Sequence, residues 1–424
     1  MTPISLFAYR VVTTLGVPLA GPFLSARLKK GKEDPKRIGE RRGRASAARP
    51  EGRLIWMHGA SVGEAMSLLP FVDRIMRAGA TALVTTGTVT SAALLAQRLP
   101  RGAIHQYAPL DSPIYLRRFL KHWLPDAALF AESELWPNML IESKRAGLPL
   151  AMINGRISAR SFNRWRRAPG FVGALLSNFD ICLARSEEDG ERLAALGAPN
   201  VLIAGDIKFD APALPVDRRE LAELSGLTSG RQIWIAASTH EGEEVIAAEA
   251  HRRLAAEFPD ALTLIAPRHP ERGEAILREL EGLGFACALR SRGASPGPGT
   301  AIYICDTIGE LGLFYRLAGV VFLGKSFAGG GGQNPIEPAR LACAILHGPL
   351  IGNFTDAYAA LDRSGGARLM ARPEALGDAL IELFANGAKL RAAARAAGDT
   401  VDRLAGAVER SMRALEPMLP TAAS

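Results

Sequence analysis

The sequence has few residues that could build a disulfide framework or a metal centre. Its four cysteines, Cys182, Cys287, Cys305 and Cys343, show no CxxC spacing, and its seven histidines form no HxxxH pair. Such scattered cysteines in apolar runs are typical of buried thiols in a reducing compartment. No DxD-like acidic pair lies beside a predicted strand, which favours a site that works without a metal. With 48% hydrophobic and 22% charged residues, the chain is predicted to be globular, with two or three domains.

Positive charge is concentrated near the N-terminus. Residues 27–44 hold nine Lys and Arg against three acids, so this segment carries +6 of the formal net charge of +8. A general nucleic-acid binder would spread its basic residues over a binding face, so the charge distribution argues against that class. A second basic run contains Arg156, Arg160, Arg164, Arg166 and Arg167, with Phe162 and Trp165 between them. This run fits a nucleic-acid patch, a site for a phosphorylated lipid headgroup, or a solvated helix face.

Residues 4–25 are largely apolar and directly precede the first basic segment. Their length is near the roughly 20 residues that a membrane-spanning helix needs. Arg10, Pro18 and Pro22 argue against a straight span, and a secretory signal is disfavoured because the positive charge follows the apolar run. An in-plane or shallow anchor, with Lys and Arg against anionic cytoplasmic lipid, fits best. The alternative is an ordinary amphipathic helix packed on the protein body.

From Arg53 onward, short apolar runs alternate with helical patterns. Strands are predicted at 54–58, 82–86, 128–132, 150–154, 180–184 and 201–205, and then at 232–238, 262–267, 301–305, 320–324 and 343–347. Such alternation predicts an α/β fold with parallel sheets covered on both faces. We expect an anchor and basic segment at 1–45 and two Rossmann-like domains, 46–214 and 215–424, facing a central cleft. Ligands in such sheets bind at the carboxyl ends of the strands.

The segment Val320–Asn353 carries the most informative loop. Gly324–Gln333 contains four consecutive glycines, and Asn334 with Pro335 predicts a helix start. A glycine loop that ends at a helix N-terminus suits a phosphate, because free backbone N–H groups and the positive end of the helix dipole face it. Glu337 would then face a ligand's hydroxyl groups, as in ribose recognition. The alternative is a flexible loop between two core elements.

Three further loops of the second half follow predicted strands. Ala237–Glu241 offers hydroxyl groups, Pro267–Pro270 includes Arg268 for bidentate phosphate contact, and Asp306–Glu310 opens a helix. Each loop taken singly also fits a simple helix cap. Together with the glycine loop they favour a nucleotide site.

The first half offers candidate acids and bases. Glu64 ends the stretch HGASVGE, Glu132 and Glu134 flank Ser133, and Lys208 lies in GDIKFD. Each alone is also consistent with a solvated surface residue. A helix N-terminus lowers the pKa of a carboxylate and so weakens Glu64 as a base. Only burial, or the charge of Glu132 or Glu134, would restore its basicity.

Taken in order, the motifs resemble one enzyme family, the Kdo (3-deoxy-D-manno-octulosonic acid) transferases of lipopolysaccharide synthesis. The resemblance rests on KRIGERRG, HGASVGE, ESELWPN, NGRIS, GDIKFD, PRHPER, DTIGELG, GGQNPIEPA and HGP with NF following, and it covers nearly the whole chain. It implies a GT-B glycosyltransferase with an N-terminal membrane-associating helix, at the cytoplasmic face of the inner membrane. Such an enzyme would transfer Kdo with inversion from CMP-Kdo to a lipid A precursor, lipid IVA.

The resemblance also implies roles for individual residues. Glu64 corresponds to the base that deprotonates the acceptor hydroxyl, and Glu134 and Lys208 to transition-state stabilisers. The implied contacts to CMP are Pro267, Arg268, Ile308, Gly309, Glu310, Asn334, Pro335, Ile336 and Glu337. No metal and no cofactor beyond the donor is implied, and the partners are CMP-Kdo, the lipid A precursor and anionic membrane lipid, without nucleic acid. The turn HGASVGE departs slightly, because Gly59 and Ala60 stand where we expect bulkier residues.

Two other functions fit parts of the sequence. A GT-B nucleotide-sugar epimerase also has two Rossmann-like halves, but such enzymes are soluble, and residues 4–44 speak against one. A membrane-attached lipid-binding adaptor without catalysis is the second alternative. The presence of Glu64, Lys208 and Arg268 together argues against the adaptor.

Overall fold

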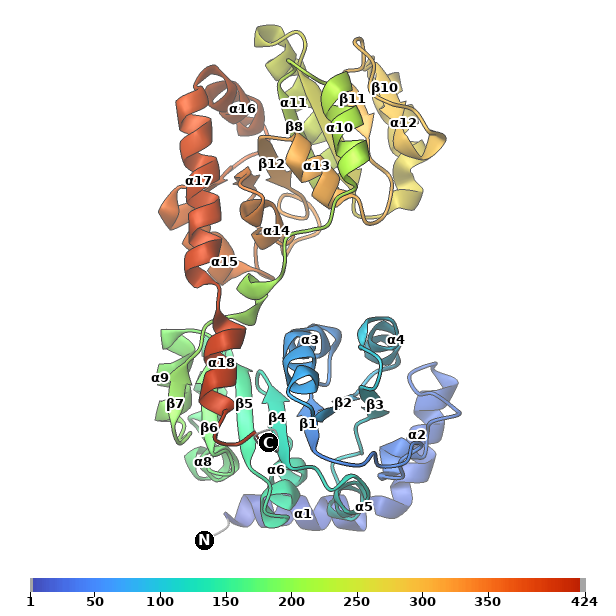
Figure 1. Cartoon of the computed structure of the whole chain (residues 1–424), viewed down its shortest axis with the longest axis vertical. Coiled ribbons are helices and arrows are strands. Elements are labelled where there is room, and N and C mark those ends of the chain that lie inside the picture. The colour runs from blue at the N-terminus through green and yellow to red at the C-terminus, as the bar shows by residue number, and fades with distance from the viewer. Residues whose placement is uncertain (1–2, 420–424) are drawn as a thin grey trace. The chain divides into compact units, whose positions relative to one another are not determined.

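The computed structural model describes residues 3–419, which form two compact units (Figure 1). Unit 1 comprises Met1–Asp210 and Ala405–Ser424, and unit 2 comprises Ala211–Leu404. Each unit is built on a seven-stranded parallel sheet with helices around it. The predicted α/β class with two Rossmann-like halves is confirmed.

The strands of unit 1 are β1 (Leu54–His58), β2 (Thr81–Thr86), β3 (Ile104–Tyr107), β4 (Ala127–Ala131), β5 (Leu150–Gly155), β6 (Ile181–Ala184) and β7 (Val201–Ile203). Its helices are α1 (Ile4–Leu15), α2 (Ala20–Lys29), α3 (Val62–Arg77), α4 (Val89–Arg98), α5 (Pro113–Trp123), α6 (Pro137–Arg145), α7 (Ala159–Trp165), α8 (Pro169–Leu176), α9 (Glu187–Ala195) and α18 (Ala407–Leu415). Short 3₁₀ turns are η1 (Val17–Leu19), η2 (Glu40–Arg42) and η3 (Ile207–Asp210). The strand order is β3-β2-β1-β4-β5-β6-β7.

Strand β1 shows why these residues form a central strand. All five of its residues are buried, and successive side chains point to opposite faces of the sheet. Leu54 and Trp56 pack in the core beneath α5 and α6, whereas Ile55 and Met57 pack beneath α3 and α4. A parallel strand covered on both faces therefore consists of a nearly continuous apolar run.

The strands of unit 2 are β8 (Ile233–Thr239), β9 (Leu262–Pro267), β10 (Cys287–Leu289), β11 (Ile302–Ile304), β12 (Val320–Leu323), β13 (Ala344–His347) and β14 (Ala367–Leu369). Its helices are α10 (Arg218–Leu227), α11 (Glu243–Glu257), α12 (Gly273–Gly282), α13 (Leu311–Leu317), α14 (Ile336–Arg340), α15 (Thr355–Ser364), α16 (Ala375–Ala385) and α17 (Gly387–Leu404). The 3₁₀ turns are η4 (Pro270–Arg272) and η5 (Arg290–Arg292). The strand order is β10-β11-β9-β8-β12-β13-β14.

The last described helix, α18, belongs to unit 1, whereas the sequence pattern predicts residues 215–424 as the second domain. The Asp210 carboxylate explains the difference, because it accepts hydrogen bonds from the backbone N–H groups of Gly406 and Val408. Helix α18 also packs against α3. The chain thus returns to unit 1 after α17.

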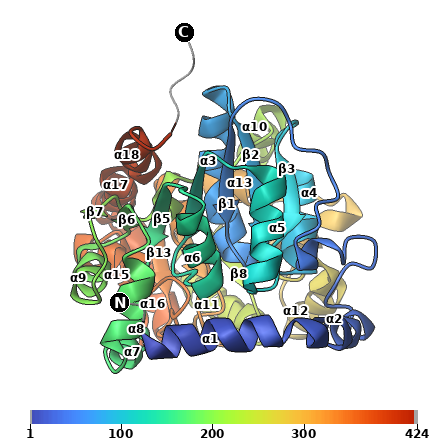
Figure 2. The same cartoon turned by 90° about the horizontal axis from the view of Figure 1, so that it is seen from below.

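Helix α1 packs on the rest of unit 1 through its polar side and exposes its apolar side. Tyr9 Oη donates to Asp111 Oδ2 at 2.8 Å, Arg10 pairs with Glu142, and Asn138 Nδ2 donates to Thr13 Oγ1 at 2.9 Å. Helix α1 packs on α5 and α6, and Figure 2 shows it running across this side of the unit. The outward side chains, Ile4, Phe7, Val12 and Leu15, are 64–87% exposed.

No single helix within residues 3–419 is long and apolar enough to cross a bilayer. The bent pair Ile4–Leu15 and Val17–Lys29, with 49° between its halves, passes that test by length and composition together.

Part of the N-terminal basic segment is neutralised within the fold. The buried carboxylates Glu33 and Glu40 pair with arginines of the same segment: Arg27 and Arg41 with Glu33, and Arg37 with Glu40. The lysines of the segment, Lys29, Lys30, Lys32 and Lys36, remain exposed.

Candidate active site

The strand order of each unit indicates where a ligand would bind. In unit 1 the order reverses between β1 and β4, which pair directly, and in unit 2 it reverses between β8 and β12. Crevices at the carboxyl ends of such neighbouring strands are the usual binding places in open α/β sheets. Most of the predicted site residues follow the carboxyl ends of these or adjacent strands.

Glu64 lies in the first turn of α3, directly after β1. It is the third residue of a capping box, in which the Ser61 backbone N–H donates to Glu64 Oε2 at 2.7 Å and the Glu64 N–H donates to Ser61 Oγ at 3.3 Å. A Cβ at Gly59 would lie 2.9 Å from the Glu64 Cβ. Glycine at position 59 therefore lets β1 turn tightly against Glu64.

The surroundings push the pKa values of Glu64 and Glu134 in opposite directions. Burial raises the pKa of Glu64, and the charge of Glu134 raises it further, against the two hydrogen bonds of Ser61. Burial acts in the same sense on Glu134, but the nearby His58, the hydrogen bond from Trp136 and the Glu64 carboxyl outweigh it, so the pKa of Glu134 is lowered. Pairs of acids with such divergent environments are suited to separate acid–base roles. The compensation that Glu64 needs as a base is therefore present.

His58 is not among the predicted site residues, but it ends β1 and contacts Glu134. Its Nε2 lies 3.4 Å from Glu134 Oε2, and its Nδ1 lies 2.9 Å from Thr85 Oγ1. Thr85 Oγ1 also accepts a hydrogen bond from Trp56 Nε1 at 2.8 Å. Because the indole N–H can only donate, Thr85 Oγ1 accepts from Trp56, and the Thr85 hydroxyl hydrogen has two acceptors in reach, His58 Nδ1 and the Met57 carbonyl at 3.4 Å. The other ring nitrogen, Nε2, faces Glu134.

Lys208 lies in η3, after β7, and its charge acts on Glu132. Burial raises the pKa of Glu132, while the charges of Lys208, Arg156 and Arg185 oppose that rise. Glu132 has a left-handed backbone, with φ of 52°. Unusual backbone angles of this kind in residues other than glycine cluster at functional sites. Glu64 and Glu134 thus form one group, and Lys208 with Glu132 a second, at the same edge of the sheet.

In unit 2, a carboxylate fills the first part of the glycine loop. Glu243, fully buried at the start of α11, accepts hydrogen bonds from five backbone N–H groups. The donors are His240, Lys325, Ser326, Phe327 and Ala328, at 2.7–3.2 Å. The N–H groups of residues 325–328 therefore serve the fold, and only the later part of the loop is left for a phosphate.

Basic side chains surround this loop. The pKa of His240 is lowered by burial and by the charges of Lys325, His269 and Arg268, although Glu243 opposes the change. The rings of His240 and His269 meet edge to face, with centroids 5.7 Å apart. Pro267 ends β9, and the Arg268 N–H donates to Thr239 O at 3.0 Å. The two cationic side chains, Arg268 and Lys325, fit an anionic ligand.

The predicted helix after the glycine loop is short. Helix α14 has five residues, Ile336 to Arg340, and follows Pro335, so its dipole contributes less than a long helix would. Asn334 Oδ1 accepts from the Ile336 N–H at 3.0 Å, and Asn334 Nδ2 donates to Glu337 Oε1 at 3.1 Å. Burial raises the pKa of Glu337, against that hydrogen bond and the charge of Arg268. The two predicted ligand contacts Arg268 and Glu337 thus lie within electrostatic reach of each other.

The third predicted contact segment is Ile308–Glu310. It contains an exposed side chain, Ile308, and a carboxylate, Glu310, that is hydrogen-bonded within the protein. Ile308 is 88% exposed, and Gly309 has φ of 89°, a conformation that favours glycine. Arg290 holds Glu310 with two hydrogen bonds of 2.6 Å and thereby lowers the pKa of Glu310. The Glu310 carboxylate is therefore engaged within the protein, which leaves backbone groups and Ile308 for a ligand.

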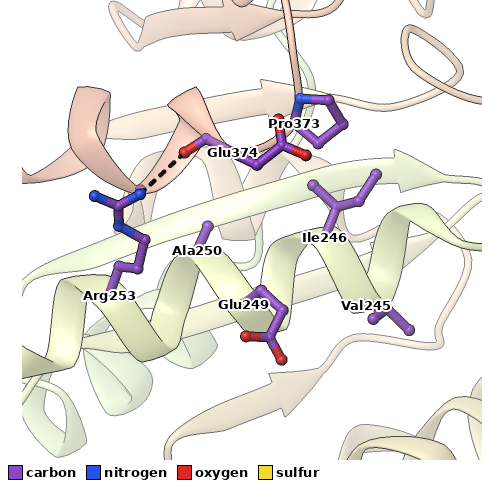
Figure 3. Close-up of a pocket in the computed structure, with 8 residues that line it drawn as sticks. Val245, Ile246, Glu249, Ala250, Arg253, Pro373 and Glu374 are labelled. Carbon is purple, nitrogen blue, oxygen red and sulfur yellow. Dashed lines mark hydrogen bonds between the residues drawn. The ribbon is translucent and has the colours of Figure 1, made fainter.

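A separate hollow of about 360 Å³ lies between α11 and α16 (Figure 3). Its lining is mostly apolar, and Arg253 reaches across it to the Glu374 carbonyl. None of the predicted site residues lines this hollow. Within residues 3–419, no group of three or more His, Cys, Asp and Glu side chains is arranged to hold a metal ion.

Comparisons with known proteins agree on one family. A family model described as 3-deoxy-D-manno-octulosonic-acid transferase (kdotransferase) matches residues 36–211. A probable mitochondrial 3-deoxy-D-manno-octulosonic acid transferase of Arabidopsis thaliana is 36% identical over 375 residues, covering 85% of this chain and 84% of the relative. The 3-deoxy-D-manno-octulosonic acid transferase of Haemophilus influenzae is 31% identical over 423 residues, with coverage of 97% and 98%.

Solved structures share the fold at low sequence identity. A putative UDP-N-acetylglucosamine 2-epimerase from Listeria monocytogenes matches with a TM-score of 0.55 at 13% identity, covering 86% of this chain and 98% of that one. MurG from Acinetobacter baumannii matches with a TM-score of 0.54 at 12% identity, with coverage of 86% and 100%. These likenesses concern the fold alone, and they confirm the predicted GT-B architecture.

Proposed function

This chain belongs to the 3-deoxy-D-manno-octulosonic acid (Kdo) transferase family, and we propose that it moves Kdo from CMP-Kdo to a lipid A precursor, lipid IVA, with inversion. The predicted family and enzyme class are confirmed by relatives 31–36% identical over most of the chain. The epimerase alternative loses its support because the likeness to an epimerase is limited to the fold. The adaptor alternative loses its support because the curated relatives are transferases. Donor, acceptor and stereochemistry are the proposed part.

The observation that carries the proposed mechanism is the divergence of Glu64 and Glu134. Burial and the neighbouring carboxylate raise the pKa of Glu64, which suits it to take the proton of an acceptor hydroxyl. The acceptor oxygen then bonds to the anomeric carbon of Kdo as the bond from that carbon to the CMP phosphate breaks. Glu134, kept ionised by His58, and Lys208 are proposed to stabilise the transition state.

In unit 2, the proposed donor contacts serve the two ends of a nucleotide. Arg268 and the later part of the glycine loop would take the phosphate, and Glu337 the ribose hydroxyls. Pro267, Ile308, Gly309 and Glu310, with Asn334, Pro335 and Ile336, complete the proposed contacts to CMP. Arg268 and Lys208 can balance the charge of the departing phosphate, so we propose neither a metal nor a cofactor.

We further propose that the enzyme sits on the cytoplasmic face of the inner membrane, with α1 in the plane of the interface. An amphipathic helix binds there with its apolar side down. Helix α1 supports this orientation, because its polar side is hydrogen-bonded to Asp111 and Asn138 while Phe7 and Val12 point outward. A spanning arrangement would break those contacts. The exposed lysines of residues 29–36 would face anionic lipid.

The test of the mechanism is Glu64→Ala, assayed by mass analysis of the lipid product formed from CMP-Kdo and lipid IVA. Loss of a base of this kind costs about 10²–10⁴-fold in rate. Because Glu64 lies in unit 1 and the donor contacts in unit 2, CMP affinity measured by calorimetry should stay unchanged. Glu191→Gln, at an exposed position of α9, is the control and should retain full activity. Full activity of the Glu64 variant would refute the mechanism, and loss of transfer and CMP affinity together would indicate damage to the fold.

A further inference from the structure

Helix α7 and the turn after it present three arginines to one hollow. Arg160, Arg164 and Arg167 are spaced at i, i+4 and i+7, so they lie on one side of the helical segment. With Ser161 and Asn163 they line a hollow of about 420 Å³, and all three arginines are exposed. We call Arg160, Arg164 and Arg167 the arginine face.

The arginine face carries positive charge without an acidic partner. Within residues 3–419, none of its three guanidinium groups has a carboxylate within 4 Å, whereas Arg185 and Arg192 of the same unit pair with Asp189 and Glu188. Three neighbouring cations repel one another, and a bound anion relieves that repulsion. Guanidinium groups and the Ser161 and Asn163 side chains are suited to phosphate oxygens.

The helix that carries the arginine face is firmly packed. Phe162 and Trp165 lie against the core of unit 1, and Trp165 stacks on Phe171 with ring centroids 6.0 Å apart and 8° between the planes. The Ser158 hydroxyl caps the helix by accepting from the Ser161 N–H at 3.2 Å. A rigid scaffold lowers the entropic cost of binding. Because both aromatic rings pack inward, they are not free to stack on nucleic-acid bases.

Helix α7 lies near the candidate carboxylates of unit 1 and near the helices that carry α1, whose apolar side is exposed. The helix follows β5 at the same edge of the sheet as Glu132 and Glu134. The next helix, α8, packs on α6, which also carries α1. Both views place α8 beside the N-terminal end of α1 (Figures 1 and 2).

We propose that the arginine face binds a phosphate monoester of the membrane-borne lipid acceptor and thereby holds the acceptor sugar for reaction. This inference rests on the proposed function, since a lipid A precursor is a phosphorylated glycolipid. It assigns to the second basic run a binding role that the catalytic mechanism leaves unassigned. Bulk anionic lipid, free phosphate and nucleic acid are the competing occupants.

The test compares two triple variants of equal charge. Arg160→Ala with Arg164→Ala and Arg167→Ala removes the arginine face. Arg77→Ala with Arg98→Ala and Arg101→Ala is the control, because these arginines are exposed and have no ion pair within the described residues. The control residues lie at or after the ends of α3 and α4, toward the opposite edge of the sheet. Circular dichroism should show both variants folded, because none of the six side chains is buried.

The measured quantities are KM and kcat with lipid IVA and with the same lipid after removal of its phosphates. The arginine-face variant should raise KM for the phosphorylated acceptor roughly tenfold or more, since each lost charged contact is worth about that factor. Its kcat should stay unchanged, and with the dephosphorylated acceptor its KM should equal that of the parent enzyme. The control variant should change neither KM. Equal KM values in all proteins, or the same shift with both acceptors, would overturn the inference.

Three binding measurements separate the competing occupants. If the arginine-face variant loses binding to phosphatidylglycerol vesicles without acceptor, the face is a general bilayer surface. If it loses affinity for a single-stranded oligonucleotide, the face is a nucleic-acid site, and if inorganic phosphate at millimolar concentration abolishes the KM difference, the face is a free-anion site. Each of these results would overturn the inference, and their absence supports it. Inactivity of the unmodified enzyme on every acceptor would instead refute the proposed function.

Discussion

Replacing Glu243 by glutamine should release the start of the glycine loop in unit 2. The carboxylate divides its five bonds between its two oxygens: Oε2 accepts from the N–H groups of His240 and Lys325, and Oε1 from those of Ser326, Phe327 and Ala328. An amide has one oxygen, and its NH₂ group can only donate. In Glu243→Gln the NH₂ group therefore faces either two or three backbone donors that it cannot satisfy.

The size of the effect follows from that count. A buried donor left without a partner costs about 1–3 kcal/mol, so two of them cost about 2–6 kcal/mol. Loss of the carboxylate charge adds to this cost, because charge-assisted bonds are roughly twice as strong as neutral ones. Since typical domains are stable by only about 5–15 kcal/mol, the loss would be visible in the unfolding of unit 2.

Hydrogen exchange followed by mass spectrometry gives the most direct readout. Peptides that contain residues 325–328 should lose protection in Glu243→Gln, and the urea midpoint of unit 2 should fall. Glu244→Gln is the matched control, because Glu244 is equally buried but bonds to Thr239 and Arg272 instead of the loop. The control should lower stability without selective exchange of the loop amides. Unchanged protection of residues 325–328 in Glu243→Gln would refute the reasoning.

Two further predictions concern unit 1. In Glu134→Gln, the acid limb of the residual transfer activity should shift to lower pH. The reason is that loss of the Glu134 charge lowers the pKa of Glu64, and a base works only when it is deprotonated. A pH profile of kcat/KM measures this, and a limb displaced to higher pH would contradict the assignment of Glu64 as the base. The double change Phe7→Ser and Val12→Ser should weaken flotation with phosphatidylglycerol vesicles roughly tenfold or more, because two apolar side chains no longer enter the interface. Leu283→Ser, an exposed position in unit 2, is its control, and equal flotation of all three proteins would exclude an in-plane α1.

Buried strands could be read from the sequence more readily than edge strands. The predicted ranges 54–58 and 262–267 coincide with β1 and β9, and the other predicted strands match to within one or two residues. The strands without a prediction are β3, β10 and β14, and each of them is an edge strand of its sheet, whereas the edge strand β7 was predicted at 201–205. An edge strand has one neighbour and is partly exposed, so it lacks the long apolar run that identifies a central parallel strand.

The candidate residues were also visible in the sequence, but their chemical state was not. HGASVGE predicts a helix start at Glu64, and a helix start alone lowers the pKa of a carboxylate. The opposite direction found for Glu64 comes from burial and from Glu134, which is 70 positions away in the chain. His58 was missed for the same reason, because its significance lies in contacts with Thr85 and Glu134.

The glycine loop shows the division between sequence and tertiary structure most clearly. Its composition alone determined that the backbone after β12 would offer N–H groups to an anion. Only the tertiary structure decided that Glu243, some 80 residues earlier, would occupy the first of them. Local sequence sets backbone geometry because glycine, proline and apolar spacing act within a few residues. Ionisation and occupancy depend on which distant groups the fold brings within a few ångströms, and that is decided only when the strands assemble.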